Sequence, residues 1–167
     1  MIRVKIVGAG GYGGVGVTEL LLEHPEAKIV CLAASADVGL AMSDLWPHLK
    51  GFCDQPIFSY EDPKAQEPAD LVFFATPDGV GMKHAEREMR QGAKIVDFSG
   101  DFRFPSVEVY NEYAKRAGKA IEHAAPHLLP QTVYGLAELE PPRLGAEARI
   151  VANAGCFAVS VLLGLAP

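Results

Sequence analysis

Three groups of residues in this sequence have types and spacings that could do chemistry. The first is GAGGYG at 8–13, a G-x-G-x-x-G pattern that follows a β-branched run and opens a helical one. Such a loop brings backbone amides to a pyrophosphate at a helix N-terminus. The second is Cys156, which follows Gly155 at the junction of a strand-like and a helix-like run. The third is Ser99 with Arg103, just after another strand-like run.

The glycine pattern predicts a dinucleotide site. Gly8 allows a tight turn, Gly10 lets the backbone approach the pyrophosphate, and Gly13 lets helix and strand pack closely. We therefore expect Gly8, Gly10, Gly11, Tyr12 and Gly13 to bind the cofactor. The alternative is a glycine-rich turn that serves only packing.

The end of the second strand-like run, LAASAD, bears on which dinucleotide binds. A carboxylate there would accept from the ribose 2′-hydroxyl of NAD. Ser35 lies where that acid would sit, and a serine can donate to a 2′-phosphate, so we predict NADP(H). Asp37, two residues on, could still reach the ribose and keeps NAD open.

A further turn, ATPDGVG at 75–81, follows the strand-like run DLVFF. Ligands of parallel sheets bind at the carboxyl ends of the strands. Ala75, Pro77 and Gly79 are therefore expected to line the cofactor crevice, although an ordinary strand–helix turn would look the same.

Arg103 follows the run VDFSG and offers a planar fork to a phosphate or carboxylate. Taken alone, a surface arginine paired with Asp97 or Asp101 is the simpler interpretation. Ser99 lies at the same expected strand end and is a second candidate for binding substrate.

Cys156 is a candidate nucleophile because a helix N-terminus stabilises a thiolate and supplies amides for an oxyanion. On position alone, a small core residue is an equal alternative. Cys31 lies mid-strand among apolar residues and is expected in the core, whereas Cys53 suggests no role.

Composition limits the possible functions. The chain has 167 residues and a net charge of −6, which argues against a nucleic-acid binder. No apolar run reaches the ~18 residues of a membrane span. The absence of a signal peptide and three widely spaced cysteines suggest a cytoplasmic protein. Metal binding is not expected, because Pro126 separates His123 from His127 and there is no Cys-x-x-Cys.

Strand-like and helix-like segments alternate along the chain. Strands are expected at 2–8, 28–35, 70–77, 94–100 and 148–153, and helices at 15–25, 79–92, 106–118 and from Cys156 onward. Residues 36–69 suggest loops with one short helix and one short strand. The pattern predicts an α/β fold, a Rossmann-type doubly wound parallel sheet.

Taken together, these segments resemble the N-terminal half of the N-acetyl-γ-glutamyl-phosphate reductase family, arginine-biosynthesis enzymes related to aspartate-semialdehyde dehydrogenases. The resemblance covers nearly the whole chain. It is carried by GAGGYGG at 8–14, WPHLKG at 46–51, FFATPDGVG at 73–81, VDFSGDFRF at 96–104, VYGLAEL at 133–139 and ANAGCFAVSVLLGLAP at 152–167. Asp78 stands where the family usually has histidine, and the arginine common beside Ser35 is absent.

The resemblance implies an NADPH-dependent reduction of an acyl phosphate through a Cys156 thioester. It implies substrate contacts from Ser99, Arg103 and Asn153, and a catalytic histidine beyond residue 167. It implies a dinucleotide-binding domain at 1–153, the start of a catalytic domain at 154–167, and a homo-oligomer at full length. Two alternatives remain: a related acyl phosphate, aspartyl or carrier-bound aminoadipyl, and a nucleotide-binding module without catalysis.

Overall fold

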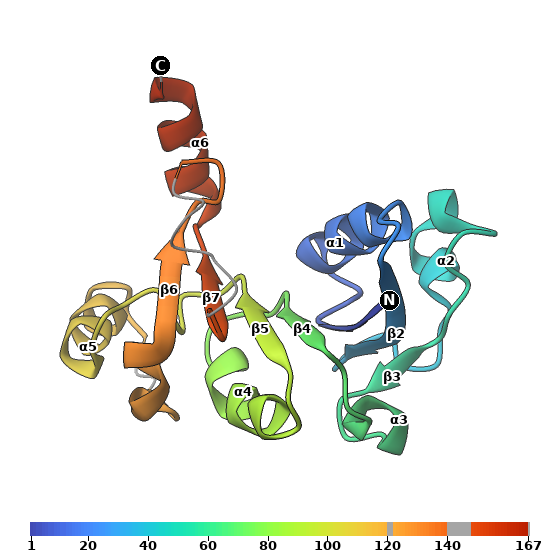
Figure 1. The fold of residues 1–167 in the computed structure, drawn as a ribbon, viewed down its shortest axis with the longest axis horizontal. Helices are drawn as coiled ribbons and strands as arrows, with labels where there is room; N and C mark the ends of the chain where they lie inside the picture. Colours follow the sequence, from blue (N-terminus) through green and yellow to red (C-terminus); the bar gives the residue numbers. More distant parts are fainter. Residues whose placement is uncertain (120–121, 140–147, 167) are drawn as a thin grey trace.

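The computed structural model describes residues 1–119, 122–139 and 148–166. Within these ranges, seven strands form one sheet in the order β3-β2-β1-β4-β5-β7-β6, and every pairing is parallel. The strands are β1 (Ile2–Val7), β2 (Ala27–Ala34), β3 (Ile57–Ser59), β4 (Leu71–Phe74), β5 (Lys94–Asp97), β6 (Thr132–Gly135) and β7 (Ile150–Asn153). Because the chain winds outward from β1 in both directions, the predicted doubly wound fold is confirmed (Figure 1).

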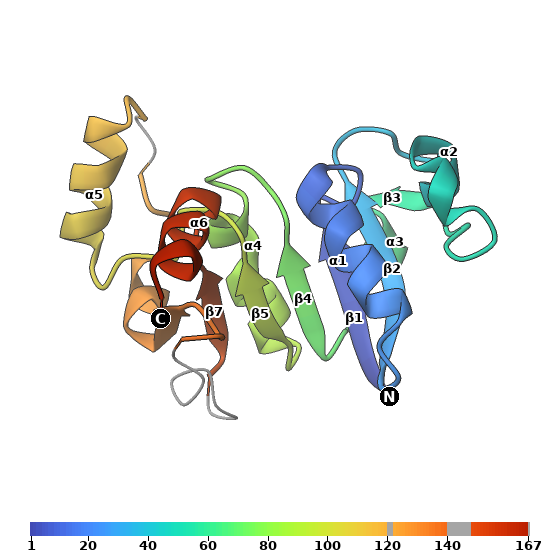
Figure 2. The ribbon, with the colours of Figure 1, turned by 90° about the horizontal axis from the view of Figure 1, so that it is seen from above.

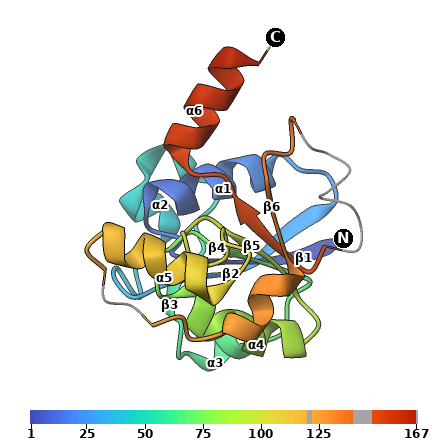
Figure 3. The same cartoon turned by 90° about the vertical axis from the view of Figure 1, so that its left-hand side faces the viewer.

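Helices lie on both faces of the sheet (Figures 1, 2 and 3). The α-helices are α1 (Tyr12–Leu22), α2 (Met42–Leu45), α3 (Pro63–Gln66), α4 (Gly81–Arg90), α5 (Val107–Arg116) and α6 (Cys156–Leu165). Two 3₁₀ helices, η1 (Pro47–Leu49) and η2 (Pro126–Gln131), complete the described set. Figure 3 shows α1 and α2 on one side of the sheet and α3 and α4 on the other.

The central strands are apolar because both of their faces are covered. On one face, Val4 and Ile6 of β1 pack in a cluster with Val15 of α1 and Met42 of α2. On the other face, β4, β5 and β7 form a second cluster with α4, α5 and η2, which includes the fully buried Phe74. The site described below is therefore built on a sheet that is packed against helices on both faces.

One charged side chain of β1 is fully buried. The Lys5 ammonium donates to Glu88 of α4 at 2.8 Å and to the Ala65 carbonyl of α3 at 2.7 Å. A buried charge is tolerated only when it is paired and hydrogen-bonded, and both conditions hold here. The pair fixes α3 and α4 against the sheet beneath them.

The elements match the expectations in type, with differences at their ends. Helix α1 begins at Tyr12 rather than at 15, because the glycine loop leads directly into its first turn. The segment 36–69 contains the expected short strand but three short helical segments, α2, η1 and α3, where one short helix was expected. Strand β6 was not predicted: it has only four residues and directly follows η2, which contains Pro130.

Helix α6 projects from the rest of the fold (Figures 1 and 3). None of its described residues is buried, and Phe157 is 84% exposed. Its N-cap is Gly155, two residues after the end of β7. No helix among the described residues is long and apolar enough to cross a bilayer.

Candidate active site

The glycine loop lies between the ends of β2 and β4. Gly8 has φ +85°, and a Cβ atom on it would stand 2.3 Å from the Ala75 carbonyl oxygen. Its amide donates to the Ala33 carbonyl at 2.8 Å. Glycine is therefore required here by conformation and by close approach. Helix α1 then begins with Gly11 as its N-cap, a residue with no side chain to cover the free amides.

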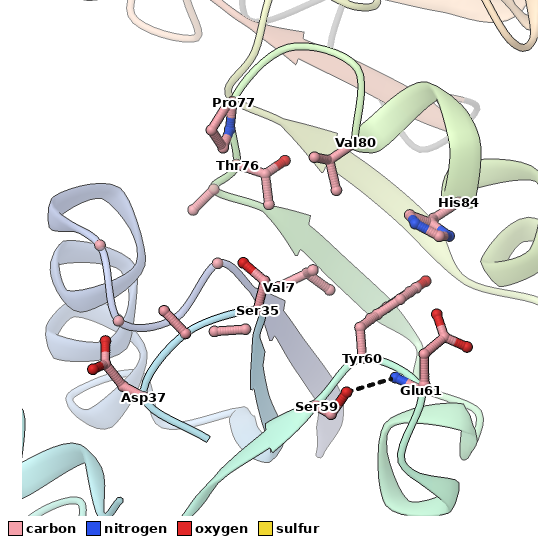
Figure 4. A pocket seen from close by; sticks show the side chains of 16 residues that line it. Val7, Ser35, Asp37, Ser59, Tyr60, Glu61, Thr76, Pro77, Val80 and His84 are labelled. Atoms are coloured by element: carbon pink, nitrogen blue, oxygen red, sulfur yellow. Dashed lines mark hydrogen bonds between the residues drawn. The ribbon is translucent and has the colours of Figure 1, made fainter. Parts of the chain in front are cut away.

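A cleft of about 610 Å³ opens beside this loop (Figure 4). Six predicted cofactor residues line it: Gly8, Gly10, Gly11, Ser35, Ala75 and Pro77. They come from the carboxyl ends of three adjacent strands, β1, β2 and β4, which is where parallel sheets bind ligands. The exposed helix N-terminus, the close backbone approach and the volume suit a dinucleotide.

Three other predicted cofactor residues lie outside the lining. Tyr12 is 87% exposed, with its ring 5.7 Å from that of Trp46. Gly13 faces Ala75, where an added Cβ would meet the Ala75 Cβ at 3.4 Å, so it serves helix–strand packing. Gly79 has φ +92°, and its amide donates to Asp101 at 2.8 Å.

The cleft also has walls that were not predicted. They are formed by Ser59, Tyr60 and Glu61 after β3, and by Thr76, Val80 and His84 around the start of α4 (Figure 4). A strand of three residues within 36–69 leaves too weak a pattern to locate its carboxyl end. The helical spacing of Val80 and His84 was visible in the sequence, and it could have placed both on the face toward the cleft.

Tyr60 is held rigidly at this wall. Its hydroxyl donates to Glu88 at 2.8 Å, its ring stacks edge-on to His84 at 4.5 Å, and the Arg87 guanidinium lies 4.3 Å above it. Burial raises the pKa of Tyr60 and lowers the pKa of His84 below its ordinary value. Both side chains are therefore neutral near pH 7 and present an aromatic wall to the cleft.

Ser99 belongs to a buried network after β5. Its hydroxyl donates to Asp97 at 2.5 Å and accepts from the Asp101 amide at 3.1 Å. Asp101 in turn accepts from the amides of Gly79 and Met82, which caps the start of α4. Burial raises the pKa of Asp97 to about 7. Ser99 is 5% exposed, so in this structure its hydroxyl serves the network.

Asp78 links two of the loops at this edge. It accepts from the Gly100 amide at 2.8 Å and pairs with the ammonium of Lys119. Burial acts to raise the pKa of Asp78, but the Lys119 and Gly100 hydrogen bonds outweigh it and hold that pKa below the ordinary value. Asp78 thus ties the turn after β4 to the turn after β5.

Arg103 contacts Asn153 at the ends of β5 and β7, beside the residue that precedes Cys156. The Arg103 Nε donates to the Asn153 carbonyl at 3.0 Å, and one terminal nitrogen donates to the Phe98 carbonyl at 2.5 Å. The alternative pairing with Asp97 or Asp101 is not seen. Gly155 lies against the same guanidinium, and Cys156 is exposed as the first residue of α6.

The remaining candidates behave more simply. Cys31 and Cys53 are buried, and burial raises the pKa of Cys31 to about 11. Glu138 is exposed. Among the described residues, no group of three or more His, Cys, Asp or Glu is arranged to hold a metal ion.

Known proteins resemble this chain in sequence and in fold. The N-acetyl-gamma-glutamyl-phosphate reductases of Acidithiobacillus ferrooxidans and Acinetobacter baumannii are 40% and 39% identical to this chain over all 167 residues. The chain spans 46% of the length of each of these relatives. Among solved structures, aspartate semialdehyde dehydrogenase II of Vibrio cholerae matches 99% of the chain and 45% of its own, at 18% identity and a TM-score of 0.69.

A second solved structure, aspartate semialdehyde dehydrogenase of Candida albicans with NADP, matches 99% of the chain and 46% of its own, at 15% identity and a TM-score of 0.63. At these identities the two structures establish the fold alone. A family model described as "Semialdehyde dehydrogenase, NAD binding domain" matches residues 3–146. This chain therefore belongs to the family of semialdehyde dehydrogenase NAD-binding domains.

Proposed function

We propose that this chain is the nucleotide-binding half of an enzyme of arginine biosynthesis. That enzyme reduces N-acetyl-γ-glutamyl phosphate to N-acetylglutamate semialdehyde with NADPH and releases phosphate. The carrying observation is Cys156, an exposed thiol at the first position of a helix, on the same sheet edge as the glycine-loop cleft. Identity of about 40% along the whole chain to reductases of that name supports this substrate.

In this proposal Cys156 is the nucleophile. Its thiolate attacks the γ-carbonyl carbon, a C–S bond forms, and the bond from that carbon to the phosphate oxygen breaks, so that phosphate leaves with the electron pair. Free amides at the start of α6 are suited to the oxyanion that forms during the attack. Arg103 has one terminal nitrogen not used in its two carbonyl hydrogen bonds, and we assign it to the substrate phosphate, with Asn153 and Ser99 as further substrate contacts.

The cofactor half of the site is assigned to the cleft. Gly8, Gly10 and Gly11 would hold the pyrophosphate at the start of α1, and Ser35 would meet the ribose. When bound, NADPH supplies the hydride that turns the thioester into the aldehyde and frees the thiolate. The uncharged wall of Tyr60 and His84 closes the cleft on the side of α4.

The domain assignment belongs to the same proposal. Residues 1–153 form the dinucleotide-binding domain and 154–167 begin the catalytic domain; residue 167 lies outside the described part. Support comes from α6, which has no buried described residue and projects from the sheet. The base that takes the proton of the Cys156 thiol is a histidine in the resembling family, and we assign it to the remainder of the enzyme. We expect the full enzyme to be cytoplasmic and homo-oligomeric. The 167-residue chain alone is expected to form no aldehyde.

Covalent labelling with the substrate tests this proposal. The chain is incubated with N-acetyl-γ-glutamyl phosphate and, separately, with β-aspartyl phosphate, and intact-mass and peptide mass spectrometry locate the acyl group. We expect acylation at Cys156, faster with the first compound, and none at Cys31, Cys53 or in a Cys156→Ser variant. Faster acylation by β-aspartyl phosphate would reassign the substrate. No acylation at Cys156, both in this chain and in the full-length enzyme that supplies the base, would favour a nucleotide-binding module without catalysis.

A further inference from the structure

The cleft wall beyond the glycine loop carries a feature that bears on which dinucleotide it accepts. We propose that this cleft binds NADH at least as tightly as NADPH, and that Asp37 is the residue that sets this balance. The inference rests on the proposed function, because it concerns the same cleft. It goes beyond that function by adding a second cofactor and by naming the side chain that admits it.

Asp37 lies at a position from which its carboxylate can reach the adenosine ribose. It lines the cleft two residues beyond Ser35, and its Oδ2 lies 3.5 Å from the point where a Cβ on Gly10 would stand (Figure 4). In a Rossmann fold, a carboxylate just after the second strand of the βαβ unit accepts from the ribose 2′-hydroxyl of NAD. The carboxylate therefore stands beside the loop that holds the pyrophosphate, on the side where the adenosine ribose must lie.

The backbone conformation at Asp37 is unusual and is held by hydrogen bonds. Asp37 has φ +59°, and it is the one non-glycine residue with a positive φ in the described ranges. The turn is fastened on both sides: the Leu40 amide donates to the Asp37 carbonyl at 3.2 Å, and the Gly39 amide donates to Ile57 of β3 at 2.8 Å. These backbone hydrogen bonds hold the Asp37 Cα beside the cleft, so its carboxylate is attached at a fixed point of the wall.

The charged side chains that line the cleft are acidic. Two carboxylates, Asp37 and Glu61, line the cleft, and no lysine or arginine is found among its described lining residues. His84 offers no compensating charge near pH 7, because burial lowers its pKa. A 2′-phosphate carries between one and two negative charges, so it would face a carboxylate without a cationic partner. NADH brings only a hydroxyl to the same place.

Ser35 keeps the cleft open to NADPH. Its hydroxyl can donate to a phosphate oxygen or to a ribose oxygen with equal ease. The two side chains thus differ in their effect: Ser35 tolerates either cofactor, and the charge of Asp37 shifts the balance toward NADH.

Affinity measurements on the 167-residue chain test the inference. Dissociation constants for NADH and NADPH are measured by calorimetry for the wild type, for Asp37→Asn and for a control, Glu112→Gln, which removes an exposed acid on α5. Asparagine tolerates a left-handed φ as well as aspartate does, so the substitution removes charge without straining the turn. Circular dichroism and thermal unfolding confirm that each variant is folded.

We expect the wild type to bind NADH at least as tightly as NADPH. Relief of charge repulsion in Asp37→Asn should move the ratio of the two constants toward NADPH by about tenfold. Glu112→Gln should leave the ratio unchanged. Tighter binding of NADPH by the wild type, or an unchanged ratio in Asp37→Asn, would overturn the inference and leave the proposed function standing. Binding of neither dinucleotide would overturn both.

Discussion

The guanidinium of Arg103 lies directly against Gly155, the residue before the candidate nucleophile. A Cβ atom on Gly155 would stand 2.8 Å from Nη1 of Arg103. The side chain cannot retreat freely, because it donates to the carbonyls of Phe98 and Asn153. One arginine thus connects the end of β5, the end of β7 and the turn into α6.

This contact predicts the effect of Gly155→Ala. The added methyl group should displace the guanidinium and disrupt its two carbonyl hydrogen bonds, lowering the free energy of unfolding by about 1–3 kcal/mol. Urea denaturation at pH 7 measures the change. The matched control is Gly164→Ala on exposed α6, where an added Cβ has nothing within 4 Å. Equal stability of the two variants would contradict this account of Arg103.

Two glycines of α1 make a second matched pair. A Cβ on Gly14 would stand 2.4 Å from the Gly8 carbonyl oxygen, whereas one on Gly16 would have nothing within 4 Å. Gly16→Ala should stabilise the protein by about 0.5–1 kcal/mol, because alanine loses less backbone entropy in a helix. Gly14→Ala should destabilise it and abolish NADPH binding. Thermal unfolding and calorimetry test both, and a Gly14→Ala variant as stable as the wild type would refute the loop geometry.

Asp97 predicts a pH dependence of stability. Burial raises its pKa from 3.8 to about 7. Between these values the folded state holds a proton that the unfolded chain has released, so this group's contribution to the free energy of unfolding falls as the pH rises. The substituted side chain in Asp97→Asn does not titrate, so the variant lacks this loss. The free energy of unfolding of Asp97→Asn, minus that of the wild type, should therefore increase by roughly 2 kcal/mol from pH 5 to pH 8. Chemical denaturation at several pH values measures this difference, which a pH-independent result would contradict.

Trp46 is far from the glycine loop in the sequence but contacts it in the fold. Its indole N–H donates to the Gly10 carbonyl at 3.3 Å. Trp46→Phe keeps an aromatic ring but loses this bond, so NADPH binding should weaken by about three- to tenfold, with a stability loss near 1 kcal/mol. Calorimetry gives the affinity, with Phe52→Leu as the control at an exposed ring outside the cleft. Unchanged affinity in Trp46→Phe would mean that the loop is held by other contacts.

Long, regular segments made the central architecture predictable from the sequence. The β-branched runs and the glycine pattern at 8–13 were enough to predict the parallel sheet and the cleft beside α1, because local pattern and burial agree there. The wall at Tyr60 and His84 was not predicted, since it depends on β3, a strand of three residues. The burial of Ser99 and the two carbonyl hydrogen bonds of Arg103 depend on tertiary contacts that spacing along the chain does not encode.

The proposed function requires Cys156 to be a nucleophile beside a bound dinucleotide. The most direct measurement is its rate of alkylation by iodoacetamide, followed by mass spectrometry with and without saturating NADPH, with buried Cys31 and Cys53 as internal controls. Adenosine 2′,5′-bisphosphate, which lacks the nicotinamide, serves as the control ligand. We predict that Cys156 reacts selectively and that NADPH, but not the control ligand, slows the reaction. The same rate with and without NADPH would contradict the account.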